Sequence, residues 1–284
     1  MDKSITDVLV NSCSPIQIEG RDGLITTSVR FATEEELRAF AKELIQAAGA
    51  RIDISKPFAE ITLASEYGLL RVHCILGGEC SIGTQLAIRR HSLNTFSLEQ
   101  LLEENFLTIE QLRVLREIIQ SGKNFVIAGA TGSGKSTLLR AMLNEITSER
   151  IITIEDAREL HLTKAVSLFT RSNNHEGVGA ITLSQLLREA LRMRPDRIVI
   201  GEARGEELAV LLQALNTGHS GTGFTIHANS ADEVLARMLA MLAIGNIQPG
   251  LGRMMIGSAL DYVIYLTKSP KRQLLTIQKL VNHA

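Results

Sequence analysis

The spacing of apolar side chains changes close to Ser97, and this change divides the chain into two parts. In the first part, apolar residues recur at helical spacing after Thr33 and Glu36, which form a capping-box pair, and Gly49 suits the end of the predicted helix. Short apolar runs then predict three strands, at 61–64, 69–76 and 85–90. The turn residues between the first two runs indicate a hairpin.

The first thirty residues show weak periodicity, so they are predicted as irregular or strand-like. The helix and the strands that follow them predict a small α+β domain built on an antiparallel sheet. We expect this N-terminal domain to cover residues 1–94.

In the second part, helices alternate with short apolar strands, which is typical of a parallel sheet with crossover helices. Three capping boxes predict helix starts, at Ser97 with Gln100, Thr108 with Gln111 and Thr182 with Gln185. Core strands are expected at 124–128, 151–155, 197–201 and 222–227. The runs 261–266 and 274–280 predict a strand pair that adds an edge to the sheet. We therefore expect an α/β domain over residues 95–284.

Composition narrows the class of protein. The chain has 284 residues, of which 45% are apolar and 21% charged, enough for a substantial core. No apolar run approaches the roughly 20 residues that cross a bilayer, and the start of the chain lacks a basic leader with an apolar core. These features favour a cytoplasmic protein. The three cysteines are too few and too irregularly spaced for a disulfide framework or a zinc site.

The charge balance argues against tight nucleic-acid binding. Thirty basic and thirty-one acidic residues leave a net charge of -1, and no Lys/Arg block stands out. Aromatic residues make up 4% of the chain and Trp is absent, so stacking platforms are scarce. We expect no direct sequence-specific nucleic-acid binding.

The strongest chemical signal is a phosphate-binding loop between a predicted strand and a predicted helix. Its glycines let the backbone turn tightly and direct N–H groups inward, and the helix N-terminus adds partial positive charge. Lys135 is expected to reach the β- and γ-phosphates of a nucleotide, Ser136 to join the shell of Mg²⁺, and Thr137 to assist near the α-phosphate. The loop alone does not distinguish a kinase, a transporter, a switch or a motor. The loop consists of Gly129, Ala130, Thr131, Gly132, Ser133, Gly134, Lys135 and Ser136.

Acidic residues end two further strands of the same predicted sheet. Glu155 and Asp156 follow one apolar strand, and Glu202 follows another, two residues before Arg204. Because the carboxyl ends of parallel strands share one edge, we expect these acids near the phosphates, where they can hold Mg²⁺ through water or polarise a water molecule. A histidine at the end of a fourth strand, His227, is interpreted as a γ-phosphate contact.

Arg89 and Arg90 end the last strand of the first domain. They are either two surface arginines or a contribution from a separate domain to the nucleotide pocket.

In this order, the motifs resemble those of the secretion and traffic ATPase superfamily, which drives type II and type IV secretion, conjugation and type IV pili. The zinc-binding tetracysteine insertion of the type II export and pilus-assembly branches is missing. Segments 191–197, 201–205 and 216–219 are most similar to the conjugative-transfer and type IV secretion branch. The matching elements are the phosphate-binding loop, an acidic box at Glu155 and Asp156, a Walker B variant ending in Gly201 and Glu202, and a histidine box from His219 to His227.

The resemblance implies a RecA-like ATPase domain and a role for each matching residue. Catalysis would be carried by Lys135 together with Glu202, which activates the hydrolytic water. Glu155 would help to place Mg²⁺ through water, and His227 would sense the γ-phosphate. Arg89 matches an Ile-Arg element of the family and would reach the phosphates from the first domain.

The resemblance also implies a homohexameric ring on the cytosolic face of the inner membrane, acting on proteins of a secretion channel. One departure matters: Gly201 stands where a Walker B aspartate often lies. The division of labour between Glu155 and Glu202 is therefore left open.

The sequence thus predicts an ATP-hydrolysing motor of type IV secretion or conjugative transfer. Two alternatives stay within the same family: a motor of a type IV pilus or a type II-like secretion system, and a nucleotide-gated assembly switch with slow hydrolysis. A nucleic-acid motor of the RecA type is disfavoured by the charge and aromatic content.

Overall fold

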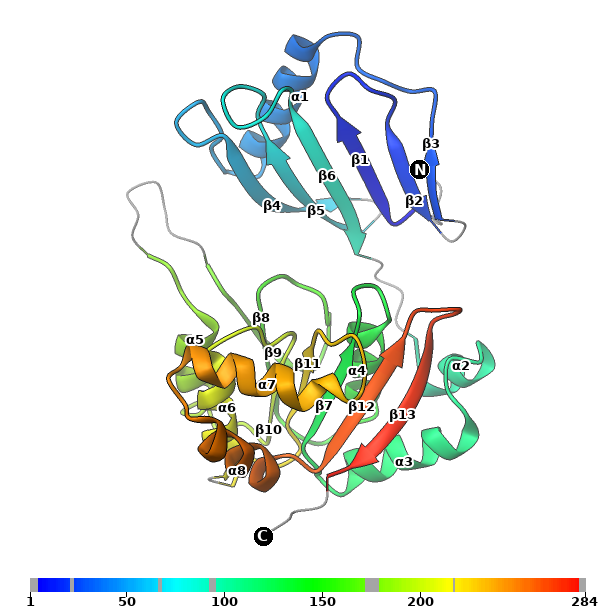
Figure 1. The fold of residues 1–284 in the computed structure, drawn as a ribbon, viewed down its shortest axis with the longest axis vertical. Coiled ribbons are helices and arrows are strands. Elements are labelled where there is room, and N and C mark those ends of the chain that lie inside the picture. Colours follow the sequence, from blue (N-terminus) through cyan, green and yellow to red (C-terminus); the bar gives the residue numbers. More distant parts are fainter. Residues whose placement is uncertain are drawn as a thin grey trace. The chain divides into compact units, whose positions relative to one another are not determined.

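A computed structural model describes residues 5–20, 23–65, 68–91, 96–171, 179–216 and 218–280. The chain divides into two compact units, Met1–Asn94 and Thr95–Ala284 (Figure 1). Each has its own sheet and its own hydrophobic core. The two units are described separately below.

The first unit is a six-stranded sheet with one helix packed against it. The strand order is β3-β2-β1-β6-β5-β4, and every neighbouring pair is antiparallel. Helix α1, Glu34–Ala47, buries Leu37, Ala41 and Ile45 against the sheet residues Val72 and Cys74. The strands are β1 Asp7–Asn11, β2 Gln17–Gly20, β3 Gly23–Thr26, β4 Phe58–Ser65, β5 Gly68–Ile75 and β6 Gln85–His91.

The predicted helix signals are confirmed, with one difference at the cap. The Thr33 hydroxyl accepts a hydrogen bond from the Glu36 N–H at 3.2 Å, but the Glu36 carboxylate accepts from the N–H of Ala32 instead of that of Thr33. At the other end, Gly49 takes a left-handed conformation with φ 73°. The N–H of Ala50 then bonds the Ile45 carbonyl at 3.1 Å, which ends the helix as a glycine C-terminal motif does.

The predicted β4–β5 hairpin is present, although its turn, 66–67, lies outside the described residues. The first thirty residues contain three strands that the pattern alone did not resolve, β1 to β3. Most of their side chains are half-buried or exposed, so they lack the clear alternation of a strand that covers a core.

The second unit is a seven-stranded sheet of order β13-β12-β7-β11-β10-β8-β9. All neighbouring strands are parallel except β13, which pairs antiparallel with β12 at the edge, as predicted. The short strand β9 was not predicted; its residues are only half-buried. The strands are β7 Phe125–Gly129, β8 Ile151–Glu155, β9 Val166–Phe169, β10 Arg197–Ile200, β11 Gly223–Ile226, β12 Tyr262–Thr267 and β13 Gln273–Lys279.

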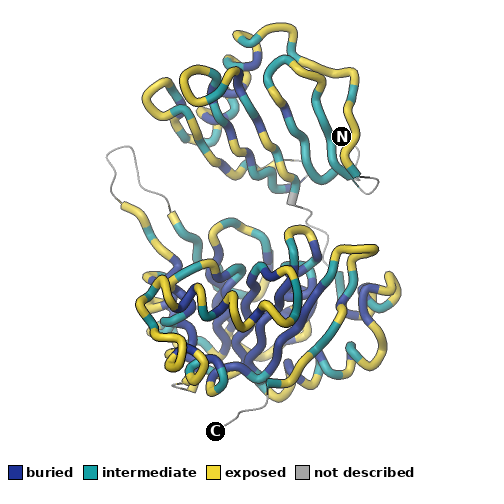
Figure 2. The backbone as a smooth tube through the Cα atoms, in the orientation of Figure 1, coloured by how far each residue is buried: buried dark blue, intermediate teal, exposed yellow. Residues whose placement is uncertain are grey.

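Helices cover both faces of this sheet, so its central strands are buried throughout (Figure 2). Along β7, Phe125 and Ile127 pack with α2, α3 and α4, whereas Val126 and Ala128 pack with α5 to α8. This is the alternation of a strand between two helical layers. The helices are α2 Leu98–Glu103, α3 Ile109–Gln120, α4 Lys135–Asn144, α5 Leu183–Ala190, α6 Glu207–Asn216, α7 Glu233–Ile244 and α8 Pro249–Ala259.

All three capping boxes predicted in this unit form, with both reciprocal hydrogen bonds, at the starts of α2, α3 and α5. Within the described ranges no single helix is long and apolar enough to cross a membrane; the bent pair α7 and α8 meets that length and composition test only when taken together. The α/β fold class with a smaller α+β unit is as predicted.

Candidate active site

The phosphate-binding loop connects the end of β7 to the start of α4. Gly134 forms the N-terminal cap of α4 in a left-handed conformation with φ 99°, where a side chain would be strained. A Cβ atom on Gly129 would lie 2.5 Å from the backbone oxygen of Leu266 on β12 and 2.7 Å from the Ser133 hydroxyl. Glycine is therefore required at both ends of the loop, and the helix N-terminus faces it with free N–H groups.

Lys135 is buried within this loop, with 7% of its surface exposed. Its ammonium donates to the carbonyls of Gly129 and Ala130, both at 2.9 Å, and lies 3.2 Å from Nδ1 of His227. These contacts match the three donors of the ammonium group. Burial lowers the pKa of Lys135 to about 8, against the opposing effect of the Glu202 and Glu159 charges.

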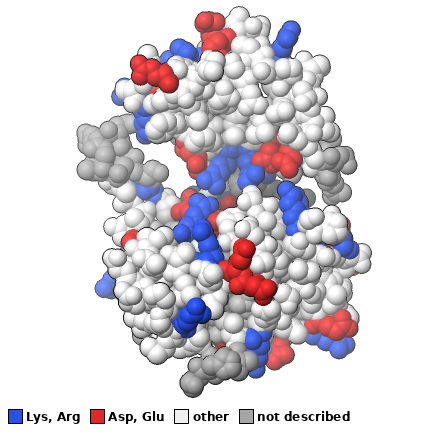
Figure 3. Space-filling model, in the orientation of Figure 1, with Lys and Arg blue, Asp and Glu red and all other residues white. Residues whose placement is uncertain are grey.

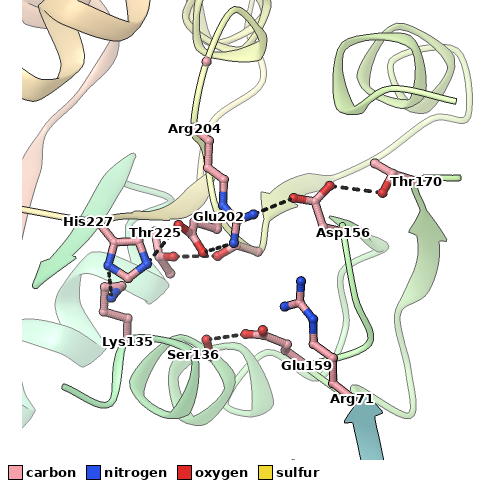
Figure 4. Close-up of polar contacts among 12 residues, drawn as sticks. Arg71, Lys135, Ser136, Asp156, Glu159, Thr170, Glu202, Arg204, Thr225 and His227 are labelled. Atoms are coloured by element: carbon pink, nitrogen blue, oxygen red, sulfur yellow. Dashed lines mark hydrogen bonds and ion pairs between the residues drawn. The ribbon is translucent and has the colours of Figure 1, made fainter. Parts of the chain in front are cut away.

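Glu202 and His227, from the ends of β10 and β11, meet beside Lys135 (Figure 4). Nε2 of His227 lies 3.0 Å from one carboxylate oxygen of Glu202, and the other oxygen accepts from Arg204 at 2.9 Å. The structure therefore brings Lys135, His227 and Glu202 into one continuous chain of contacts.

The surroundings of His227 and Glu202 shift the pKa values of both side chains. Burial, together with the Lys135 charge, holds the pKa of His227 below its ordinary value, although Glu202 opposes the shift. Burial raises the pKa of Glu202, but the hydrogen bond and charge of Arg204, together with the charge of Lys135, outweigh it and hold that pKa below its usual range. At neutral pH, Glu202 is ionised and His227 is neutral. The tautomer with the proton on Nε2 satisfies both of its contacts.

Glu155 lies buried at the end of β8, and its contribution to placing Mg²⁺ stays a prediction. It is 2% exposed, and its carboxylate accepts the backbone N–H groups of Glu159 at 2.8 Å and Leu160 at 3.1 Å. A Cβ on Gly201 would lie 3.1 Å from Cγ of Glu155. The absence of a side chain at Gly201 thus leaves room for Glu155, whose pKa is raised by burial.

The acid that the structure places against the Ser136 hydroxyl is Glu159, at 2.9 Å. The sequence motifs did not predict a role for this residue, although it lies only four positions after Glu155 in the same acidic segment. A hydroxyl and a carboxylate are hard oxygen donors, and Mg²⁺ usually combines one or two such groups with substrate phosphates and water. This pair fits Mg²⁺, whereas no cluster of three or more His, Cys, Asp or Glu suited to a metal occurs in the described parts of the chain.

The remaining predicted residues lie as follows. Ser133 is fully buried and its hydroxyl has no hydrogen-bond partner, while Thr131 and Gly132 are exposed at the tip of the loop. Thr137 is half-buried in the first turn of α4. Arg89 belongs to the first unit, where it forms an ion pair with Asp7 at 2.7 Å, and its contact with nucleotide stays a prediction.

Comparison with known proteins identifies the family. Residues 1–278 match the family described as Type II/IV secretion system protein. The chain belongs to this family. A conjugal transfer protein of Mycobacterium tuberculosis is 38% identical over 272 residues, which cover 93% of this chain and 76% of the relative. The type IV secretion system protein PtlH of Bordetella pertussis is 34% identical over 264 residues, covering 84% of this chain and 77% of the relative.

Solved structures of the family share the fold. The VirB11 ATPase of the Brucella suis type IV secretion system, solved with sulphate, is 25% identical with a TM-score of 0.53, covering 98% of this chain and 90% of that one. The pilus retraction motor PilT with bound ADP is 20% identical with a TM-score of 0.68, covering 98% and 80% respectively. The predicted resemblance to the conjugative-transfer and type IV secretion branch, and the RecA-like fold, are confirmed.

The burial of Lys135 generates a direct prediction. Because burial favours the neutral amine, its reactivity toward acetic anhydride should rise with a midpoint at about pH 8 in the folded protein. Competitive labelling read by mass spectrometry measures this midpoint. The same lysine in the urea-denatured chain is the control and should titrate near the ordinary value of about 10.4. A folded-state midpoint close to the denatured one would contradict the burial described above.

Proposed function

We propose that this protein hydrolyses ATP and that hydrolysis powers a type IV secretion or conjugative-transfer apparatus. One observation carries the proposal: Lys135 of the phosphate-binding loop is linked through His227 to Glu202, an ionised carboxylate at the end of a neighbouring strand. A loop for phosphates beside a fixed carboxylate supports hydrolysis more strongly than nucleotide binding alone. The names of the type IV secretion and conjugal transfer relatives support the process that it serves.

The loop would hold the phosphates of ATP with its backbone N–H groups and the N-terminus of α4. Lys135 would exchange its contacts with the Gly129 and Ala130 carbonyls for the β- and γ-phosphates. Thr137, one residue after Ser136, would lie closest to the α-phosphate.

Ser136 and Glu159 would hold Mg²⁺, the serine directly and the glutamate directly or through water. The ion would neutralise the charge that develops on the phosphates during the reaction. Glu155 would fix the backbone of the segment that carries Glu159.

Glu202 would accept a proton from the attacking water on one carboxylate oxygen. Its low pKa keeps it ionised, and His227 lies against that carboxylate and against Lys135 at the same time. His227 would therefore respond when Lys135 engages the γ-phosphate. Arg89 of the first unit would add positive charge to the pocket, as the resemblance implies.

The assembly is also a proposal. A homohexameric ring on the cytosolic face of the inner membrane, pulling on proteins of a secretion channel, is what the family resemblance implies. Opening and closing of the two units around such a ring would transmit the energy of hydrolysis.

Replacement of Glu202 tests the chemistry. Glu202→Gln keeps the shape but removes the base, so kcat should fall by about 100- to 10,000-fold while the Kd for ATP stays within about twofold. Steady-state phosphate release and binding of a fluorescent ATP analogue measure the two quantities. Glu189→Gln, an exposed carboxylate on α5, is the control and should keep wild-type rates. Wild-type turnover by Glu202→Gln would remove this residue from the chemistry.

The magnesium assignment is tested by a matched pair of substitutions. Glu159→Gln should raise the Mg²⁺ concentration for half-maximal ATPase rate by about 10- to 100-fold, because a carboxylate ligand is lost. Glu155→Gln should lower the free energy of unfolding with little change in that concentration, since its carboxylate holds backbone N–H groups. If Glu155→Gln, and not Glu159→Gln, raised that Mg²⁺ concentration, Glu155 would be the residue that places the metal.

The ring is tested by solution mass with and without a nonhydrolysable ATP analogue and Mg²⁺. We expect six chains per particle with the analogue. A monomer under both conditions would exclude the ring.

A slow assembly switch and a motor predict different transport in cells that carry Glu202→Gln. If nucleotide binding alone organised the apparatus, cells carrying Glu202→Gln would transport as well as wild type. The motor predicts that transport is lost together with hydrolysis.

A further inference from the structure

Arg204 joins two acids that come from the ends of two neighbouring strands. Its guanidinium donates to Glu202 at 2.9 Å and lies 3.6 Å from the carboxylate of Asp156, which follows β8 (Figure 4). Strands β8 and β10 are paired in register, so the two acids stand side by side at the same edge of the sheet. The sequence motifs predicted no role for Arg204 and no separate role for Asp156.

Both ends of this bridge are fixed by the backbone around them. Beneath Arg204, the N–H of Gly205 donates to the Glu207 carboxylate at 2.8 Å, and the Arg204 N–H donates to the same oxygen. Glu207 begins α6 and is 6% exposed. The N–H of Ala203 bonds the carbonyl of Thr225 on β11 at 2.9 Å. The guanidinium therefore extends from an anchored turn.

Asp156 is held from the other side. The hydroxyl of Thr170, just after β9, donates to its second carboxylate oxygen at 3.0 Å, and the Thr170 N–H bonds the carbonyl of Glu155 at 3.1 Å. The carboxylate that faces Arg204 is thus oriented by a residue on a third strand end.

These contacts restrict the carboxylate of Glu202. One of its oxygens is held by Arg204 and the other lies against His227, so the rotation of the carboxylate is restricted. A catalytic carboxylate gains rate from such restriction, because a small misplacement of a reacting group is costly.

We propose that Arg204 and Asp156 are positioning residues for hydrolysis: Asp156 orients the guanidinium of Arg204, and Arg204 holds the Glu202 carboxylate where its free lone pairs meet the attacking water. This inference rests on the proposed role of Glu202 as the base. Neither residue touches the reacting atoms; both act through Glu202.

Charge distinguishes this role from direct phosphate binding. The guanidinium already faces two carboxylates, so the group of Asp156, Glu202 and Arg204 carries a net negative charge. A guanidinium shared between two carboxylates offers less positive charge to a phosphate than one that is unpaired. Lys135 and the helix N-terminus, by contrast, present positive charge to the loop.

The experiment compares ATPase kinetics of the full chain for Arg204→Gln, Arg204→Lys, Asp156→Asn, the double variant Arg204→Gln with Asp156→Asn, and Glu202→Gln. Arg192→Gln is the matched control. Arg192 is exposed, and its ion pair, with Glu189 at 3.4 Å, involves none of the residues under test. For each variant, kcat comes from phosphate release and the Kd from binding of a fluorescent ATP analogue. Thermal unfolding confirms that each variant is folded.

Arg204→Gln should lower kcat by about 100-fold with the Kd for ATP within about twofold of wild type. Arg204→Lys, a point charge that reaches one acid at a time, should recover part of the rate. Asp156→Asn should lower kcat by about 10-fold, and the double variant should be no slower than Arg204→Gln alone, because Asp156 acts through Arg204. Arg192→Gln should keep wild-type kinetics.

Two results would overturn the positioning role. A raised Kd for ATP with unchanged kcat in Arg204→Gln would make Arg204 a nucleotide ligand. If the two losses in kcat multiplied in the double variant, Asp156 would not act through Arg204. Glu202→Gln distinguishes a failure of the proposed base from a failure of the positioning role. If it keeps wild-type kcat, the proposed function of Glu202 fails; if it is inactive while Arg204→Gln is normal, only the positioning role fails.

Discussion

The parallel pairing of β8, β10, β11 and β7 is the constraint on which the active site depends. Because these strands run in one direction and in register, all four end at the same edge of the sheet. That edge receives the phosphate-binding loop from β7, Glu155 and Asp156 from β8, Glu202 from β10 and His227 from β11. The burial of the central strands between two helical layers makes this register rigid.

Burial at that edge of the sheet also shifts the pKa values of the side chains there. Lys135 and Glu155 are buried and Glu202 is half-buried, and their pKa values shift in different directions from the ordinary ones. Burial raises the pKa of Glu155 in spite of its backbone hydrogen bonds, whereas the pKa of Glu202, which pairs with Arg204, falls. Of the two acids at neighbouring strand ends, Glu155 is thus buried against backbone donors and Glu202 is ionised, in agreement with the base proposed above. Gly201 leaves room for the buried Glu155 side chain, since a Cβ there would lie 3.1 Å from Cγ of Glu155.

Much of this was predictable from the sequence, and what was missed has physical reasons. Capping boxes and the apolar runs of the buried strands located most of the parallel sheet, because those signals are local. Strands β1 to β3 were not resolved, since their half-exposed residues show no clear period. Motif order predicted which acids lie at the edge, but not which way each turns. That depends on contacts such as Glu159 with Ser136, which join residues 23 positions apart.

The most direct test of the account is a high-resolution structure of the full chain with Mg²⁺, ADP and aluminium fluoride, which imitates the transferring phosphate. The account predicts a water molecule in line with the fluoride group, with an oxygen of Glu202 at about 3 Å from it. Arg204 should still hold the other oxygen, and Glu159 should lie beside the metal. Glu155 at that water, with Glu202 turned away, would contradict the account.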